Sequence, residues 1–536
     1  MFRFIFVFYS LLFVSLFAQA QNAPFDIQLT PISIKGVGGL QSFAFGQHEG
    51  KWLVVGGRLD GLHRRQPFAS FDIAGHNTQI YVIDPENNQS WTASLNVLPS
   101  SVKEQLSATN LEFYQEGNML YIIGGYGYSA TSADHITYPN LTAIDIPKLI
   151  FAIQNDLNIK PYIRQIYDEK MAVTGGYLHK IYGTYYLVGG QKFIGRYNPM
   201  GPNNGPGFIQ EYTNAIRKFT IHDDGITIKI KHLPEIYDRT NLHRRDYNVA
   251  AQIMPDGQEG MTAFSGVFQE TVDLPFLTCV NIDSSGHEIQ QGFNQYYNHY
   301  HCAHIPLYSA ENNDMHTLFF GGIAQYFDEN GVLVKDDNVP FVNTIARVTR
   351  HKDGSMAEYK LPVSMPALLG AGSEFIPKDD LPMYENGVLK LDEITKDTTM
   401  IGYIYGGISS SAPNIFFINT GTQSSASSQV FKVHLIKNKR TSIHDVNVQS
   451  QNGLGMIIFP NPSDDKLTIK FDLQSKAEVR LKVTDLQGKI MNTFNWGHLS
   501  SGAHQFNISE DFDNQNILIF QLQAGDKIST QKVIVK

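Results

Sequence analysis

The chain has 536 residues, of which 42% are hydrophobic and only 17% are charged. Its formal net charge is −9 and it has no long basic stretch, which disfavours nucleic-acid binding. Its 45 glycines and its 12% content of aromatic residues favour an all-β fold with many tight turns over a helical fold. Cys279 and Cys302 are too few for a disulfide framework. They could form one bridge or stay as two thiols, and we expect them to be buried.

Residues 1–20 have the pattern of a cleaved signal peptide. Arg3 supplies a short basic region and an apolar run extends from Ile5 to Phe17. Ala18 and Ala20 are small residues at the −3 and −1 positions, so we expect cleavage after Ala20. The apolar run is short for a membrane span, which needs about 20 apolar residues. We therefore expect export, with no transmembrane segment left in the mature chain.

The middle of the chain contains an internal repeat. Short hydrophobic runs end in a glycine pair, and each is rich in β-branched and aromatic residues. Such runs between turn signals predict strands that are buried on both faces. Five runs have the full pair and a sixth has serine in place of the first glycine; they are Trp52–Gly57, Met119–Gly125, Tyr185–Gly190, Leu318–Gly322, Tyr403–Gly407 and Thr262–Gly266.

Each run is preceded by one strand-like segment and followed, after a variable loop, by two more. Six such four-stranded units cannot bury both faces alone, and radial packing into a six-bladed β-propeller satisfies them. We expect the propeller to span residues 21–437. The segment Phe25–Ile34 is the candidate for a strand that closes the last blade.

These repeats resemble the kelch family. In the first repeat the glycine pair is followed by Tyr81, Trp91 and then Leu98-Pro99. The third repeat leads into Arg244-Arg245, similar to the arginine that enters a kelch blade. The resemblance implies a kelch-like propeller. Kelch-like relatives include copper oxidases and a sialic acid epimerase, so an enzyme has precedent on this fold.

The tail is predicted to be a separate domain. Residues 438–452 are polar and aperiodic, as in a linker, and residues 453–536 have the alternating strands of a small β-sandwich. A generic adhesion sandwich is the plain interpretation. The tail also resembles the type A C-terminal sorting domain of type IX secretion cargo, through Phe459, Pro460, Asn461, Pro462, Asp485, Gly488 and Lys536. This resemblance implies a Bacteroidetes-type organism, the type IX machinery as a partner, and a secreted or outer-membrane surface location reached through the periplasm.

One face of the propeller should gather the long loops, because the loop after the second strand and the loop entering the next blade lie on the same side. Binding usually resides in long loops on a rigid scaffold. Guanidinium groups pair bidentately with carboxylates, so an acidic sugar or another carboxylate would suit this face. The candidate ligand-binding residues are Arg58, His63, Arg64, Arg65, Arg196, Tyr197, His243, Arg244 and Arg245.

A metal site is the second candidate. His299, His301 and His304 have a spacing that could complete a zinc or copper set, although no carboxylate lies in this segment. No cofactor is firmly implied beyond this possible transition metal. The alternative for the histidines is that they form hydrogen bonds with backbone groups. The alternative for Arg244 and Arg245 is that they have a packing role in the fold and bind no ligand.

The sequence thus favours an exported propeller that binds a glycan or a protein through its loop-rich face. The alternative is an extracellular enzyme on the same scaffold, either carbohydrate-active and epimerase-like or a metal-dependent oxidase.

Overall fold

The computed structural model describes residues 24–438, apart from 202, 204, 206, 330 and 331. In the C-terminal part it describes residues 454, 456–459, 466–485, 489–509, 517–525 and 527–534. The predicted signal peptide and nearly all of the predicted linker lie outside these residues. The described residues up to Asn438 form one compact unit, and those from Leu454 onward form a second.

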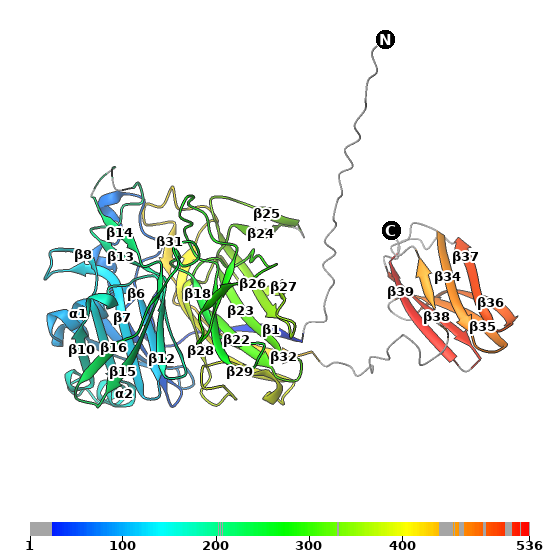
Figure 1. Cartoon of the computed structure of the whole chain (residues 1–536), viewed down its shortest axis with the longest axis horizontal. Helices are drawn as coiled ribbons and strands as arrows, with labels where there is room; N and C mark the ends of the chain where they lie inside the picture. Colours follow the sequence, from blue (N-terminus) through cyan, green and yellow to red (C-terminus); the bar gives the residue numbers. More distant parts are fainter. Residues whose placement is uncertain are drawn as a thin grey trace, which may run out of the picture. The chain divides into compact units, whose positions relative to one another are not determined.

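Six antiparallel sheets form the first unit, each with the four strands that the repeat predicts (Figure 1). Blade 1 contains β2 (Ala44–His48), β3 (Lys51–Val55), β4 (Gln79–Asp84) and β5 (Gln89–Ser94). Blade 2 contains β6 (Thr109–Glu116), β7 (Met119–Ser129), β9 (Asn140–Asp145) and β10 (Ile163–Tyr167). Blade 3 contains β11 (Tyr177–Ile181), β12 (Thr184–Val188), β15 (Ala215–Asp223) and β16 (Ile228–His232). Blade 4 contains β18 (Asn248–Ile253), β19 (Glu259–Phe264), β20 (Cys279–Ile282) and β21 (His287–Ile289). Blade 5 contains β22 (His304–Ser309), β23 (Asp314–Ile323), β26 (Phe341–Arg350) and β27 (Met356–Ser364). Blade 6 contains β28 (Ala371–Pro377), β30 (Thr398–Ser410), β32 (Val430–Lys437) and β1 (Phe25–Ile32).

The first strand of the chain closes the propeller. β1 pairs antiparallel with β32 from Phe25↔Lys437 to Ile32↔Val430, so the two ends of the propeller segment share the last blade. This confirms the predicted closing strand. Because the closure joins residues about 400 positions apart, it makes the six blades one continuous ring.

The glycine pairs are required by the backbone. Gly124 and Gly125 have φ of +62° and +84°, and all five other pairs also have positive φ, including Ser265 at +50° in the serine variant. A Cβ on Gly124 would lie 1.8 Å from the carbonyl oxygen of Val173, which no side chain tolerates. The second strand therefore ends in a left-handed turn pressed against the entry of the next blade.

The long insertions carry structure of their own. We call the segments after the glycine pairs, residues 58–78, 126–139, 191–214, 267–278, 323–340 and 408–429, the loop face. β8 of blade 2 touches β13 of the next insertion through Ile136↔Ile194, so these loops share one side as predicted. The additional strands are β8 (Asp134–Thr137), β13 (Gln191–Ile194), β14 (Ile209–Tyr212), β17 (Ile236–Tyr237), β24 (Tyr326–Glu329), β25 (Val332–Lys335), β29 (Leu389–Lys390) and β31 (Ser424–Ala426).

Two short helices occur that the repeat does not predict. α1 (Ser100–Leu106) lies between blades 1 and 2, and α2 (Ile146–Gln154) connects β9 to β10. Asp145 caps α2 by accepting a hydrogen bond from the backbone of Lys148. Short 3₁₀ turns cover residues 67–69, 73–75, 95–97, 160–162, 169–171 and 391–393. Within the described residues, no helix has the length and apolar character needed to cross a membrane.

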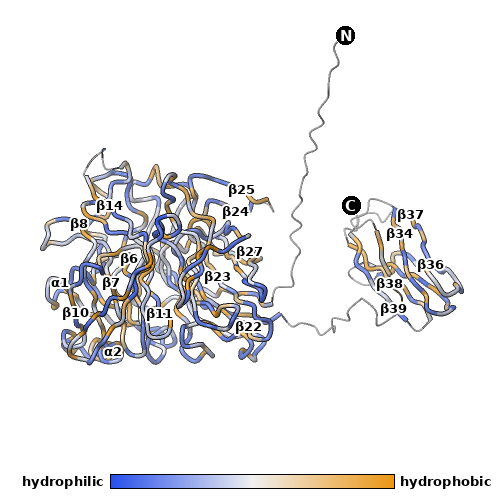
Figure 2. The backbone as a smooth tube through the Cα atoms, viewed as in Figure 1, coloured by the Kyte–Doolittle hydropathy of each residue, from blue (hydrophilic) through white to orange (hydrophobic). Residues whose placement is uncertain are grey.

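Clusters of buried hydrophobic side chains join neighbouring blades. Figure 2 shows hydrophobic residues recurring along the strands of the propeller. The second unit is a two-sheet sandwich with its own core around Leu481, Phe520 and Val533. Its sheets contain β33 (Ile457–Phe459), β34 (Lys466–Leu473) and β37 (Gly502–Ser509), and β36 (Ile490–Leu499), β35 (Ala477–Thr484), β38 (Ile517–Ala524) and β39 (Lys527–Ile534).

Candidate functional site

A ring of backbone hydrogen bonds surrounds the propeller axis where the inner strands begin. In five of the six blades, the N–H group of the ring residue donates to the carbonyl of the ring residue in the preceding blade, at 2.7–3.2 Å. Between blades 2 and 3 the link is the hydroxyl of Thr174, which donates to the Asn110 carbonyl. The ring residues are Ser42, Asn110, Gly175, Asp246, His301 and Gly372.

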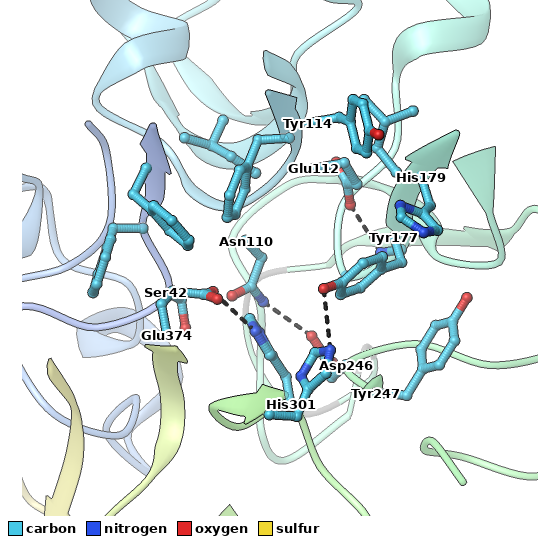
Figure 3. A pocket seen from close by; sticks show the side chains of 18 of the residues that line it. Ser42, Asn110, Glu112, Tyr114, Tyr177, His179, Asp246, Tyr247, His301 and Glu374 are labelled. Atoms are coloured by element: carbon cyan, nitrogen blue, oxygen red, sulfur yellow. Dashed lines mark hydrogen bonds and ion pairs between the residues drawn. The ribbon is translucent and has the colours of Figure 1, made fainter. Parts of the chain in front are cut away.

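A cavity of about 200 Å³ begins at this ring and continues along the inner strands (Figure 3). Its polar lining includes three carboxylates, Glu112, Asp246 and Glu374. Histidines and aromatic rings complete the wall, with Phe45, Phe113, Tyr114, Tyr177, Tyr247, Phe375, His179, His301 and His304. All six blades contribute residues, so the cavity belongs to the central channel.

Glu112 is a buried carboxyl group with one unsatisfied oxygen. Its exposed fraction is 2%, and Oε1 accepts a hydrogen bond from the backbone N–H of Gly176 at 2.8 Å. Oε2 has no hydrogen-bond partner among the described residues. Burial raises the pKa of Glu112 well above its usual value, against the Gly176 N–H, which favours the anion. Burial therefore favours the protonated, neutral form of this side chain over its anion.

His179 lies one step further along the same wall. It is 8% exposed, its ring packs edge-on against Tyr114 with centroids 5.4 Å apart, and its Nε2 has no partner in the described part of the chain. Burial lowers the pKa of His179 to about 4, so its imidazole is neutral. Glu112 and His179 together bring two unsatisfied buried polar atoms to one cavity.

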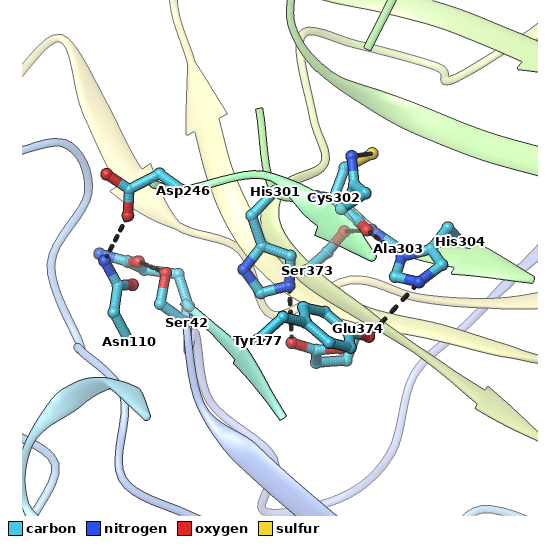
Figure 4. A network of polar contacts seen from close by, with 12 residues as sticks. Ser42, Asn110, Tyr177, Asp246, His301, Cys302, Ala303, His304, Ser373 and Glu374 are labelled. Carbon is cyan, nitrogen blue, oxygen red and sulfur yellow. Dashed lines mark hydrogen bonds and ion pairs between the residues drawn. The ribbon is translucent and has the colours of Figure 1, made fainter. Parts of the chain in front are cut away.

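His301 and Glu374 form an ion pair in the same cavity (Figure 4). His301 Nε2 lies 3.0 Å from Glu374 Oε1. Burial by itself lowers the pKa of His301, but the Glu374 and Asp246 carboxylates outweigh burial and raise it. Asp246 in turn accepts hydrogen bonds from Asn110, at 3.0 Å, and from Arg245. Asp246 thus has a cationic partner in Arg245, and Glu374 has one when His301 is protonated.

The three histidines of the predicted metal site point to different partners. The ring nitrogens of His299 contact the Gln295 carbonyl at 2.9 Å and the backbone N–H of Gln325 at 3.0 Å. His304 lies against the carbonyls of Cys302 and Val249. The described residues contain no group of three His, Cys, Asp or Glu side chains that could hold a metal ion. The geometry therefore does not support a metal site at His299, His301 and His304.

Arg244 and Arg245 are held inside the structure. Arg244 is 1% exposed, donates to the carbonyls of Asn241, Ser265 and Thr278, and stacks 4.1 Å over the ring of Phe276. It joins strands of blade 4. Its role is therefore the packing role that was the alternative expectation for this residue. Arg245 bonds Asp246 and the hydroxyl of Tyr212.

The other four arginines of the predicted ligand site lie on the loop face. Arg58 is buried and binds Asp60 through two hydrogen bonds of 2.6 Å. Arg65 donates to the Pro199 carbonyl at 2.7 Å, and Arg196 donates to the Phe68 carbonyl. Arg64 is exposed and has no hydrogen-bond partner among the described residues.

The remaining predicted residues pack against aromatic rings. His63 touches Tyr197 with ring centroids 4.8 Å apart, and burial lowers its pKa to about 4. His243 stacks on Tyr212 at 3.8 Å. The structure thus brings Arg58, His63, Arg65, Arg196 and Tyr197 together, whereas Arg244 belongs to the interior of blade 4.

The cysteines and the sorting residues complete the comparison with the sequence. Cys279 and Cys302 are both free and buried, which confirms the expected burial. Of the sorting residues, Phe459 and Asp485 are described: Lys470 lies over the Phe459 ring, and Asp485 accepts a hydrogen bond from the backbone of Lys489. Pro460, Asn461, Pro462, Gly488 and Lys536 lie outside the described residues.

The sequence analysis missed the cavity residues. Glu112 and Glu374 each stand two positions after a ring residue, Asn110 and Gly372, and are therefore equivalent in blades 2 and 6. Aligning the repeats on their inner strands would have placed two carboxylates at one position of strands that are otherwise mostly apolar. His179 carries the same signal, two positions further along.

Comparisons with known proteins bear on both units. Residues 457–536 match the family model described as a secretion system C-terminal sorting domain. A comparison with curated proteins finds no match. Among solved structures, one match is titled "Structure of YjhT"; it has 10% sequence identity and a TM-score of 0.39, and it covers 76% of this chain and 99% of that chain. The first unit is thus a six-bladed β-propeller with glycine-paired blades. The tail carries a C-terminal sorting domain of the type IX secretion kind, so the protein is secreted or attached to the outer-membrane surface.

Proposed function

We propose that the exported propeller binds a small, neutral, hydroxyl-rich molecule of monosaccharide size in its central channel. The observation that carries this proposal is the pair of unsatisfied buried atoms, Glu112 Oε2 and His179 Nε2, on the wall of one cavity. Buried polar groups in proteins almost always have a partner, because leaving one unpaired costs about 1–3 kcal/mol. A ligand that brings hydroxyl groups to both atoms removes that cost.

The charge balance of the cavity favours a neutral ligand. Burial disfavours the anion of Glu112, and the imidazole of His179, with a pKa of about 4, is neutral. Glu374 is paired with His301, and Asp246 with Arg245, so neither carboxylate is left for a cationic ligand. A charged ligand would be desolvated here without a free counter-charge.

The size and the lining of the cavity also favour a ligand of monosaccharide size. A cavity of about 200 Å³ is below the ~300–1,000 Å³ that is typical for drug-sized ligands, so a polymer does not fit inside it. Phe45, Phe113, Tyr114, Tyr177 and Phe375 offer flat apolar surfaces, and the carboxyl and imidazole groups supply donors and acceptors between them. This mixture suits a sugar ring, which has apolar faces and a polar edge.

Calorimetric titration of the full chain tests this proposal. The panel consists of neutral monosaccharides, with uronic acids and amino sugars of the same size for comparison. We expect saturable binding of at least one neutral member in the channel. Glu112→Ala should weaken that binding about tenfold or more, since it removes one of the two unpaired atoms that the sugar hydroxyls would meet. It should leave any binding of the charged analogues elsewhere on the chain unchanged. The matched control is Glu358→Ala, because Glu358 is a half-buried glutamate that accepts backbone hydrogen bonds outside the cavity. If no neutral monosaccharide binds, the proposal is wrong.

An acid–base enzyme is a second candidate, favoured by one observation. The cavity holds a carboxyl group whose pKa is raised by burial, Glu112, and a histidine–carboxylate pair, His301–Glu374, which together could donate and accept a proton. Epimerisation of a bound sugar at a C–H bond would then exchange that hydrogen with solvent. Incubation of the bound monosaccharide in D₂O, followed by NMR, should show deuterium at one carbon. If the sugar binds without any exchange, the protein is a binding module.

A further inference from the structure

Several large apolar side chains of the loop face are exposed to solvent, and four of them lie in segments that contact one another. Phe68 is 72% exposed, Phe417 64%, Ile418 58% and Met200 44%. They come from the insertions of blades 1, 6 and 3, which are far apart in the sequence. Single exposed hydrophobic residues are ordinary on protein surfaces, but a group of them on one side marks an interaction surface.

Contacts between the three insertions join these residues into one surface. The guanidinium of Arg65 lies 5.3 Å over the ring of Phe417 and donates to the carbonyl of Pro199, which precedes Met200. Arg196 donates to the carbonyl of Phe68. Blade 1 is thus linked to blade 6 and to blade 3 through the two arginines. We call Arg64, Arg65, Phe68, Arg196, Met200, Phe417 and Ile418 the arginine–aromatic surface.

The surface is positively charged in a chain whose net charge is −9. Arg64 is exposed and has no hydrogen-bond partner in the described part of the chain, and Arg65 and Arg196 each use one N–H on a backbone carbonyl. A guanidinium has five N–H donors, so most donors of these three groups remain available. Two acidic groups lie nearby: Asp60 is bound by Arg58, and Asp72 accepts a hydrogen bond from the backbone of Ala74.

We propose that the arginine–aromatic surface binds a carboxylate-bearing polysaccharide, such as a polymer of uronic acids. Exposed aromatic rings offer flat faces for sugar rings, and guanidinium groups pair with carboxylates in a bidentate way. The core of a protein interface is depleted of charge, whereas here guanidinium groups lie between the apolar side chains. That alternation fits a chain in which each sugar unit presents a ring face and a carboxylate. This site is additional to the proposed function, because none of its residues lines the channel cavity.

The test measures binding of the full chain to three uronate polymers, polygalacturonate, alginate and hyaluronan, with neutral dextran as the reference. We expect binding to at least one uronate polymer, a loss of binding as salt is raised, and no binding to dextran. The double variant Arg64→Ala/Phe417→Ala should weaken the binding about tenfold or more.

The matched control is Arg480→Ala/Phe151→Ala. Arg480 lies in the sorting domain, and Phe151 is 59% exposed on α2. This control removes the same two types of side chain from other surfaces and should bind as the wild type does. Absence of binding to all three polymers, or equal binding by both double variants, would overturn the proposal. Neither result touches the monosaccharide titration, so the two proposals fail separately.

Discussion

The loop face and the central channel use their polar residues in opposite ways. On the loop face, Arg58 binds Asp60, Arg65 and Arg196 bind backbone carbonyls, and in the blade below it Arg244 binds three carbonyls. In the channel, Glu112 and His179 are also buried, and yet each has an atom without a partner among the described residues. One loop-face atom, His63 Nδ1, shares that condition. Many arginines in long loops can therefore serve to hold the loops together, and unsatisfied buried atoms are the better guide to a small-ligand site.

The largest expected effect is on stability and concerns Arg244. If Arg244 bound a ligand, the contrast between structural arginines and the unsatisfied groups of the channel would not hold. Arg244→Ala should lower the free energy of unfolding by about 3–5 kcal/mol, because it leaves several buried carbonyls unpaired and removes the packing against Phe276. Urea unfolding of the full chain measures this, following the propeller transition. Arg64→Ala is the matched control and should change stability by less than about 0.5 kcal/mol. Equal effects from both variants would contradict the structural role of Arg244.

The next effect concerns the turn that separates the channel from the loops. Gly124→Ala should cost about 2–4 kcal/mol, because φ is +62° and the new Cβ would meet the Val173 carbonyl. Gly50→Ala is a matched control with φ of +74° and open space around the Cβ, so it should cost only about 1–2 kcal/mol. Thermal unfolding of both variants gives the comparison. A smaller loss for Gly124→Ala than for Gly50→Ala would show that the close contact is not rigid.

These turns also show how far the sequence determines the fold. The glycine pairs, the blade count and the closing strand Phe25–Ile32 follow from local patterns, because each blade repeats the same backbone requirement. α1 and α2 did not follow, since each is a short insertion without a repeat. The cavity could not be predicted from any one segment, because its wall needs Glu112, His179 and Glu374 from three blades, brought together only when the ring closes.

The third effect is a pH dependence of the stability. It distinguishes Glu112, in the channel, from Glu116, at the end of the same strand β6. Burial raises the pKa of Glu112, so the folded protein resists its ionisation. The stability that follows is present below the ordinary pKa of a glutamate, near 4.3, and is lost as pH rises towards the raised value. Glu112→Gln removes this loss. The free energy of unfolding of the variant, relative to that of the wild type, should therefore increase from pH 4 to pH 8.

Glu116 on the same strand is the matched control with the opposite sign. Burial alone would raise its pKa, but hydrogen bonds from Lys180 and Tyr185 lower it. Its contribution is present above the ordinary pKa and lost as pH falls, so Glu116→Gln should lose stability relative to the wild type from pH 4 to pH 8. Denaturant unfolding at both pH values measures the two slopes. The same sign for both variants would contradict a neutral Glu112.

The smallest effect concerns the two buried thiols, Cys279 in β20 and Cys302 beside the ring residue His301. Burial raises the pKa of Cys279 and of Cys302 to about 12, and both side chains are enclosed. Because thiolates are the reactive form, we expect neither thiol to react with a disulfide reagent in the folded protein at pH 8, and both to react after unfolding. Rapid reaction of Cys302 in the native state would mean that the channel wall opens, and would weaken the assignment of a closed, fixed cavity.

The most direct test of the central claim is a crystal structure of the protein with the neutral monosaccharide that binds most tightly in the titrations. We expect electron density for the sugar inside the propeller channel, with hydroxyl groups within hydrogen-bond distance of Glu112 Oε2 and His179 Nε2. Density for the sugar only on the loop face, with the channel unchanged, would contradict the channel site and would place the small-ligand site in the loops.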